Sequence, residues 1–156
     1  MKLILYFGHT GTTKKAAEIL KEKLQDAEIF DGTKKLMKDF SRYDMIIFGT
    51  NIHMERPHKH FIKKLKKLKK KNLTIPFHGF VLSANSSEKI KYMNKVKELL
   101  GDESYIGYFG GELNPDYAKG ITRLVIQACI QKLAEDDLPL PKLDELAIQD
   151  FADNLK

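Results

Sequence analysis

Glycine and hydroxyl residues at the junction of a predicted strand and a predicted helix are the first candidates for chemistry in this sequence. Gly8–Thr13 reads Gly-His-Thr-Gly-Thr-Thr, after an apolar run at Lys2–Phe7 and before a helical apolar pattern from Ala16 to Leu24. The first N–H groups of a helix are unsatisfied, and glycine lets the backbone close around an anion. Threonine hydroxyls add neutral donors. The segment therefore predicts a phosphate site, although an ordinary turn with a threonine cap fits the loop equally well.

The signatures of two common nucleotide sites are absent from this loop. It lacks Gly-x-x-x-x-Gly-Lys-Ser/Thr, the pattern of nucleoside-triphosphate loops, and Gly-x-Gly-x-x-Gly, the pattern of Rossmann dinucleotide sites. Thr10-Gly11-Thr12-Thr13 instead resembles the Thr-x-Thr-Gly-x-Thr loop with which flavodoxins hold the phosphate of FMN. Gly8 stands where that pattern has its first hydroxyl, so one side-chain donor is missing.

Length and composition indicate one globular unit. We expect the 156 residues to form a single domain, residues 1–156, and the 42% hydrophobic and 31% charged contents are typical of soluble proteins. The single cysteine, Cys129, excludes an internal disulfide and a cysteine zinc site, and its apolar surroundings predict a packed, inert thiol. Neither a signal peptide nor a membrane-spanning run is evident, which predicts a cytoplasmic protein.

Much of the net charge of +6 comes from eight lysines between Lys59 and Lys71. Phe61, Leu65 and Leu68 are spaced as the buried stripe of an amphipathic helix that carries these lysines. The helix is either a solvated outer face or a basic patch for an anionic membrane surface or an acidic partner. No recognised nucleic-acid motif accompanies the charge, so we expect no nucleic-acid partner.

Short apolar strands alternate with helices along the chain, which predicts an α/β fold with a parallel sheet covered on both faces. The best fit is the flavodoxin-like doubly wound sheet of five strands in the order 2-1-3-4-5. The final helix, within Leu143–Leu155, is predicted to face inward with Leu143, Leu146, Ala147, Phe151 and Leu155. The predicted strands are Lys2–Phe7, Ala27–Phe30, Tyr43–Gly49, Phe77–Ser83 and Tyr105–Phe109.

This topology predicts where a ligand binds. Ligands of doubly wound sheets lie beyond the carboxyl ends of the strands, where the winding direction switches. The loops Gly8–Thr13, Thr50–Arg56 and Ala84–Ser87 should therefore converge there and bind one FMN, with the phosphate on the first loop and the ring between the other two. The predicted FMN-binding residues are Gly8, His9, Thr10, Gly11, Thr12, Thr13, Thr50, Asn51, Ile52, His53, Met54, Ser83, Ala84, Asn85, Ser86 and Gly111.

Two alternatives remain open within these loops. Asn85 and Ser86 could simply cap the following helix. His53 could stack on a flavin or form a hydrogen bond near it. His58 and His60 are spaced poorly for sharing an ion and no carboxylate cluster accompanies them, so we expect no metal site.

The segment Asn114–Pro141 exceeds a minimal five-strand domain and is predicted to contain a helix after the last strand. From Gly120 onward this helix is apolar on nearly all sides. Burial under the domain body, a homodimer contact, a membrane surface and a docking partner all fit the pattern. Because the segment follows Gly110-Gly111, we expect it to begin beside the ring pocket and to decide what meets the flavin. Glu112, Tyr117 and Arg123 are the groups there that could bind a substrate.

With these segments placed, the chain resembles the flavodoxin-type protoporphyrinogen dehydrogenases that pass electrons to menaquinone. That family's basic-aromatic pair in the ring loop is His53-Met54 here, and its basic and aromatic residues around Asn114–Lys119 are mostly replaced. The resemblance implies the fold, FMN, and a quinone or porphyrinogen as the reaction partner. Its matching residues are Thr10-Gly11-x-Thr13, Tyr43-Asp44, Gly49-Thr50-Asn51-Ile52, His58-Lys59, Gly110-Gly111-Glu112-Leu113, Pro115, Tyr117 and Arg123.

Three functions fit these observations. The first is an FMN-dependent oxidoreductase, and the second is a noncatalytic flavodoxin-type electron carrier. Typical carriers are acidic whereas this chain is basic, and its ring loops lack tyrosine and tryptophan. Both features favour the enzyme. The third is a binding module whose flavin site has decayed, which Gly8 would allow.

Overall fold

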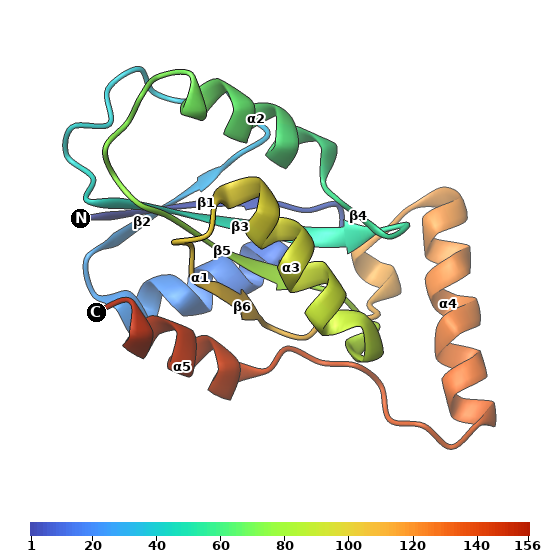
Figure 1. Ribbon diagram of the computed structural model, residues 1–156. Coiled ribbons are helices and arrows are strands. Elements are labelled where there is room, and N and C mark those ends of the chain that lie inside the picture. The colour runs from blue at the N-terminus through green and yellow to red at the C-terminus, as the bar shows by residue number, and fades with distance from the viewer.

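The computed structural model describes residues 1–156 and contains a parallel sheet in the order β2-β1-β3-β5-β6 (Figure 1). This is the predicted flavodoxin-like order 2-1-3-4-5, because β4 is a two-residue strand that pairs only with β3. Parallel register joins Leu3 to Glu28 on one side and to Ile46 on the other. The strands are β1 (Lys2–Phe7), β2 (Ala27–Asp31), β3 (Met45–His53), β4 (Arg56–Pro57), β5 (Phe77–Leu82) and β6 (Ile106–Tyr108).

Helices cover both faces of the sheet, as Figure 1 shows. Alternate β1 residues point to opposite faces: Leu3 and Leu5 pack with α2 and α3, whereas Ile4 packs with α1 and α5. Phe61, Leu65 and Leu68 are buried, as the amphipathic pattern of α2 predicts. The helices are α1 (Thr12–Leu24), α2 (Lys59–Lys69), α3 (Lys89–Leu100), α4 (Gly120–Glu135) and α5 (Glu145–Asn154), with short 3-10 helices η1 (Ser86–Glu88) and η2 (Pro115–Tyr117).

The third strand in sequence is longer than predicted. We expected it to end at Gly49, but β3 continues to His53 and the chain then turns back as β4. The polar residues from Thr50 to His53 therefore sit on an extended strand instead of an open loop. Pairing with Arg56 and Pro57 holds that extension in place.

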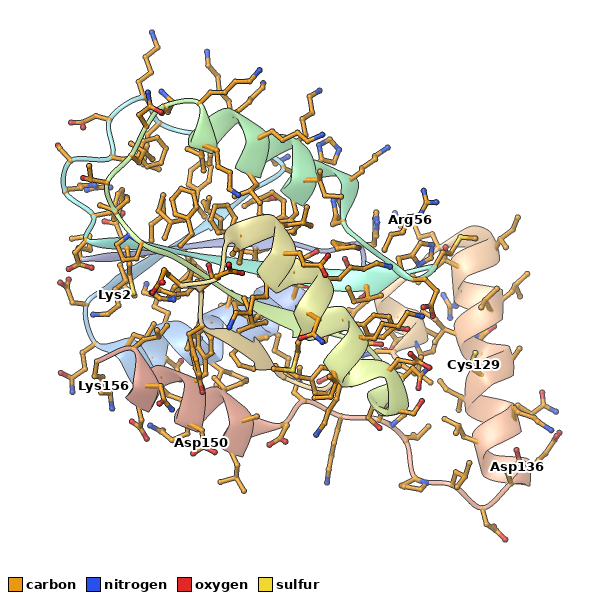
Figure 2. All side chains as sticks on the ribbon, viewed as in Figure 1. Lys2, Arg56, Cys129, Asp136, Asp150 and Lys156 are labelled. Carbon is orange, nitrogen blue, oxygen red and sulfur yellow. The ribbon has the colours of Figure 1, made fainter.

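Helix α4 lies beyond the carboxyl ends of the strands, apart from the two helical layers (Figure 1). Ile126 is its only buried residue, whereas Ile121 is 81% exposed and Leu124 is 65% exposed. Burial under the domain body is therefore not the reason for its apolar composition. The prediction of a packed Cys129 is wrong, because this residue lies exposed on α4 (Figure 2). Neither α4 nor any other helix is both long and apolar enough to cross a bilayer.

The inward face of α5 differs from the predicted one at a single turn. Leu146 is 79% exposed, whereas Ile148 is fully buried. The helix begins only at Glu145, after Asp144 accepts a hydrogen bond from the Ala147 N–H at 3.0 Å. This start sets the helical phase, so that Ile148, Phe151, Ala152 and Leu155 form the buried stripe.

Candidate functional site

The first turn of α1 presents free backbone donors. Its N-cap is Gly11, in a left-handed conformation with φ +80°, and no side chain caps the helix. The first turn also contains no acidic residue. The Thr10 and Thr12 hydroxyl oxygens lie 3.5 Å apart beside this turn. The threonine cap that the sequence left open is therefore absent, and the N–H groups and hydroxyls can meet an anion.

Gly8 makes room for a buried threonine. A Cβ atom at position 8 would lie 2.5 Å from the Thr13 Oγ1 atom and 2.8 Å from its Cβ atom. Thr13 itself is 2% exposed. The glycine that departs from the flavodoxin loop pattern is thus a packing requirement, because Thr13 fills the space that a residue-8 side chain would need.

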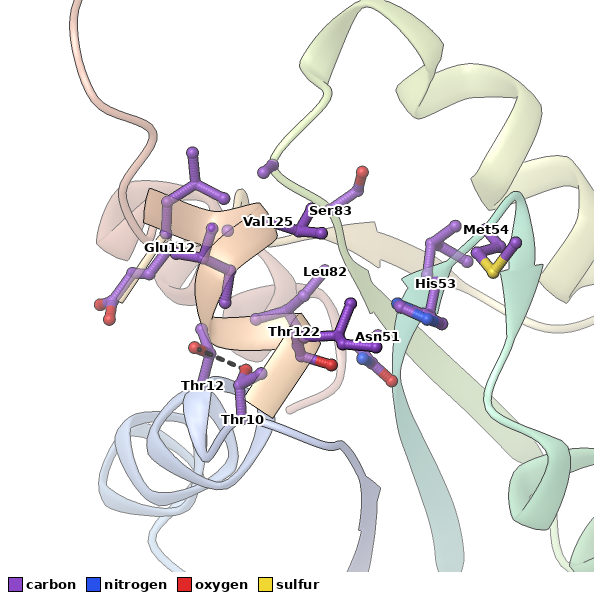
Figure 3. A pocket seen from close by; sticks show the side chains of 16 residues that line it. Thr10, Thr12, Asn51, His53, Met54, Leu82, Ser83, Glu112, Thr122 and Val125 are labelled. Carbon is purple, nitrogen blue, oxygen red and sulfur yellow. Dashed lines mark hydrogen bonds between the residues drawn. The ribbon is translucent and has the colours of Figure 1, made fainter. Parts of the chain in front are cut away.

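A cavity of about 420 Å³ opens beside this turn, at the switch point of the sheet (Figure 3). Nine of the predicted residues line it: Thr10, Thr12, Asn51, Ile52, His53, Met54, Ser83, Ala84 and Gly111. The other predicted residues, Gly8, His9, Gly11, Thr13, Thr50, Asn85 and Ser86, lie in the same loops but not in its lining. The three loops therefore converge around one hollow.

Asn51 lines this cavity and carries an unpaired acceptor. Its side-chain oxygen Oδ1 is buried and has no hydrogen-bond partner. Buried polar atoms are rarely left unpaired, because each costs about 1–3 kcal/mol. Thr50, immediately before it, is fully buried and internally satisfied: its hydroxyl accepts from the His58 N–H at 3.0 Å and donates to the Asn51 C=O at 3.0 Å. Thr50 positions the strand, and Asn51 offers the binding group.

The turn between β3 and β4 is strained and firmly tied down. Met54 and Glu55 both have positive φ angles, +48° and +66°, a conformation that usually selects glycine or asparagine. The Glu55 carboxylate accepts from the Lys91 Nζ and Tyr92 Oη atoms, both at 2.7 Å, and its C=O accepts from the Lys95 Nζ at 2.7 Å. The bonds from Lys91 and Tyr92 lower the Glu55 pKa, and all three bonds fasten the turn to α3. The hairpin, which lines the cavity with His53 and Met54, is thereby held at one orientation.

The cavity wall across from the β3–β4 hairpin is formed where the backbone at Gly111 packs closely against the backbone at Ser83 and Ala84. A Cβ atom on Gly111 would lie 2.6 Å from the Ser83 carbonyl carbon and 2.8 Å from the Ala84 nitrogen. The Ser83 N–H donates to the Gly110 C=O at 2.9 Å, and the Tyr108 hydroxyl donates to the Ser83 C=O at 2.6 Å. Asn85, the next residue, caps η1 by accepting from the Ser87 N–H at 3.3 Å. Ser83 and Ala84 therefore form the wall, and Asn85 has the capping role.

The insertion supplies a wall that sequence reasoning did not assign residue by residue. Cavity-lining residues absent from the predicted FMN-binding set are Leu82 of β5, Glu112 and Leu113 just before the insertion, and Ile121, Thr122, Val125 and Ile126 of α4. Of these, only Glu112 was expected at the pocket, as a group that could bind a substrate. The all-round apolar pattern of α4 was the available signal.

Two contacts join the start of this insertion to the first loop. Glu112 pairs with Lys15 of α1 at 2.8 Å, and the Tyr117 ring lies over Gly11, about 3.7 Å from the position of a Cβ atom there. Arg123 is exposed and forms no ion pair.

Four histidines gather on the outer side of the hairpin. The His9 and His58 rings stack with centroids 4.3 Å apart, His53 lies 5.7 Å from His9, and His60 lies 5.4 Å from His58. Burial, together with neighbouring positive groups, lowers the pKa of His58 to about 4. No arrangement of histidine, cysteine and carboxylate side chains suited to a metal ion occurs. Burial also lowers the pKa of His9, so the stacked His9 and His58 rings are neutral hydrogen-bonding groups near pH 7.

Comparison with known proteins agrees with this geometry. The family model described as Flavodoxin domain matches residues 3–138. A flavoprotein in complex with FMN from Lactobacillus acidophilus NCFM is 22% identical with a TM-score of 0.54, and the match covers 69% of this chain and 89% of that one. A two-electron reduced flavodoxin from Megasphaera elsdenii is 18% identical with a TM-score of 0.55, covering 83% and 99%.

A larger protein contains the same fold as one part. Rubredoxin oxygen:oxidoreductase from Desulfovibrio gigas is 15% identical with a TM-score of 0.55, and the match covers 86% of this chain but 35% of that one. A search of curated proteins finds no match. The family model spans most of the sequence, and the strand order and switch-point cavity are those of the same architecture. The chain belongs to the flavodoxin domain family.

Proposed function

We propose that this protein binds one FMN in the switch-point cavity and acts as a flavin-dependent oxidoreductase. The observation that carries the proposal is the buried, unpaired Asn51 Oδ1 beside the uncapped N-terminus of α1. A ligand with a phosphate and with a ring that carries an N–H group on its edge would meet both needs. The phosphate would accept from the N–H groups of the α1 N-terminus, and the ring N–H would donate to Asn51 Oδ1. The neighbouring flavoprotein from Lactobacillus acidophilus, which is described in complex with FMN, supports this choice of ligand.

The residues present suit FMN part by part. The N–H groups of the first α1 turn, with the Thr10 and Thr12 hydroxyls, would hold the phosphate. Asn51 would accept a hydrogen bond from the ring edge, with Met54 and Ala84 among the other residues of the wall. The cavity lies within the usual size range of cofactor sites. When bound, FMN supplies the redox chemistry, and the protein supplies orientation and exclusion of water.

The wall formed by α4 favours an enzyme over an electron carrier. Ile121, Val125 and Ile126 place apolar side chains in the cavity, so a reaction partner entering it meets a largely apolar surface. The hairpin presents His53 and Met54 to the ring, not a large aromatic side chain. We propose a flat, mostly apolar substrate, such as a quinone or, as the family resemblance suggests, a porphyrinogen.

Two measurements test this function. FMN added to the apoprotein should lose its fluorescence with a one-to-one end point, and Asn51→Leu should weaken binding about three- to tenfold, the effect of losing one hydrogen bond. Asn85→Leu is the matched control, because Asn85 caps η1 outside the cavity lining. Absence of saturable binding by the folded protein would refute the cofactor assignment.

A redox titration of the FMN-loaded protein then separates enzyme from carrier. A single two-electron step, followed by oxidation with a soluble quinone, supports the enzyme. Two well-separated one-electron steps with no quinone turnover would support the carrier.

A further inference from the structure

A second hollow lies on the outer side of the β3–β4 hairpin, next to the switch-point cavity. It has a volume of about 510 Å³ and is lined by His9, His53, Met54, Arg56, Pro57, His58 and Lys59. We call it the histidine cleft. His53 and Met54 line both hollows, so the hairpin is a partition between them. The proposed FMN function does not use the histidine cleft.

The charges of the histidine cleft are positive and uncompensated. Arg56 and Lys59 form no ion pair, and no carboxylate lines the cleft. The adjacent Glu55 carboxylate accepts from Lys91 and Tyr92 of α3. Asp31 is the acidic residue whose charge raises the pKa of His58 against the larger effect of burial. Its carboxylate accepts hydrogen bonds from the Thr33 N–H at 2.9 Å and from the Thr33 hydroxyl at 2.6 Å. The two permanent cations therefore have no anionic partner within the chain.

The imidazoles of the histidine cleft are arranged as donors and not as metal ligands. His58 is 5% exposed, and its Nδ1 atom accepts a hydrogen bond from the His60 N–H at 3.1 Å. Because burial keeps this ring neutral, the proton resides on Nε2, which has no partner within the protein. The His9 ring stacks on His58 and so cannot aim a nitrogen at the same ion. The lining of the cleft thus contains a neutral N–H donor together with two cations.

We propose that the histidine cleft is an anion site for the phosphoryl group of a phosphate ester. Two unpaired cations balance the two negative charges of a phosphate monoester, and the imidazole supplies a further hydrogen bond. A guanidinium is well suited to contact two phosphate oxygens at once. Since the hairpin alone separates the two hollows, such a ligand would lie beside whatever occupies the switch-point cavity.

Inorganic phosphate is the probe that tests the histidine cleft, measured by calorimetry and by the His58 ring signals in NMR spectra. Saturating FMN first occupies the Gly8–Thr13 loop, which is itself an anion site. We expect saturable binding that shifts the His58 signals and weakens at least about tenfold in the Arg56→Gln/Lys59→Gln double variant. The matched control is Lys63→Gln/Lys66→Gln, which removes the same charge from exposed α2 positions outside the cleft.

The outcomes are distinct. Equal weakening in both double variants would show general surface attraction and overturn the site, as would a lack of saturation or unchanged His58 signals. If FMN does not bind, the same titration of the apoprotein, with and without Arg56→Gln/Lys59→Gln, still reports on the cleft, because these two residues lie outside the Gly8–Thr13 loop. Failure of the proposed function and failure of the anion site are thereby separated. Glycerol phosphate and succinate, compared as ligands, then show whether the site selects a phosphoryl group over carboxylates.

Discussion

Gly111→Ala is the substitution that most sharply tests how the ring pocket is built. Its Cβ atom would lie 2.6 Å from the Ser83 carbonyl carbon, where ordinary contacts begin at 3.4 Å. The two backbone segments would have to separate by about 0.8 Å, and backbone atoms cannot swing aside as a flexible side chain can. Overpacking of this kind typically costs about 1–3 kcal/mol. We expect a fall in the melting temperature of about 2–12 °C, because 1 kcal/mol corresponds to about 2–4 °C for a protein of this size.

The same displacement moves Ser83 and Ala84, which line the cavity, so FMN affinity should fall together with stability. Gly101→Ala is the matched control. Gly101 has φ +125°, so alanine is strained there, but nothing lies within 4 Å, and the residue follows α3 outside the cavity lining. The control should lower the melting temperature without changing FMN affinity, measured by fluorescence quenching well below the melting temperature. Unchanged affinity in Gly111→Ala would refute the argument that this contact shapes the pocket.

Three further predictions concern the other walls. Gly8→Ser should weaken FMN binding because its Cβ meets Thr13, and adding Thr13→Ala should restore it; no rescue in a fluorescence titration would contradict the packing explanation. Glu55→Gln should weaken FMN binding about two- to tenfold by loosening the strained turn, whereas Glu98→Gln, an exposed change on the same α3 helix, should not. For His58, the unfolded chain takes up a proton near pH 6.5 but the folded protein only near pH 4, so stability should fall as pH decreases through that window, by up to about 3 kcal/mol. Urea unfolding of His58→Asn, which retains an N-cap acceptor, should show a clearly smaller dependence on pH, the remainder coming from the lowered pKa values of His9 and His78.

The order of the strands could be predicted from the sequence because each strand leaves a local signal. Apolar runs that end at a glycine or a polar loop mark β1, β3 and β5, and helical stripes such as Phe61, Leu65 and Leu68 mark the covering layers. Parallel strands with short connections allow few arrangements. The convergence of the three loops followed from that topology alone.

The parts that escaped prediction depend on tertiary contacts. The extension of β3 to His53 requires pairing with Arg56 and Pro57, and its tight turn has neither glycine nor asparagine to announce it. Leu146 and Ile148 exchange roles because the start of α5 fixes the helical phase. Cys129 is exposed because α4 stands away from the sheet, although its apolar sequence resembles that of a buried helix.

The unpaired oxygen of Asn51 was likewise invisible in the sequence. An asparagine in a polar loop has no distinctive pattern, and its significance arises only from burial without a partner. Gly8 shows the converse, since a departure from the phosphate-loop pattern that suggested decay of the site is explained by its contact with Thr13.

Amide NMR signals followed during addition of FMN to the isotopically labelled apoprotein test the central claim most directly. FMN in the switch-point cavity should shift the backbone signals of Gly11, Thr12 and Thr13 and the side-chain amide of Asn51, and it should shift Ser83 and Ala84 on the opposite wall. Signals at the amino ends of the strands, such as that of Lys2, should remain unchanged. Shifts confined to the lysines of α2, or no saturable shifts at all in the folded protein, would contradict the account.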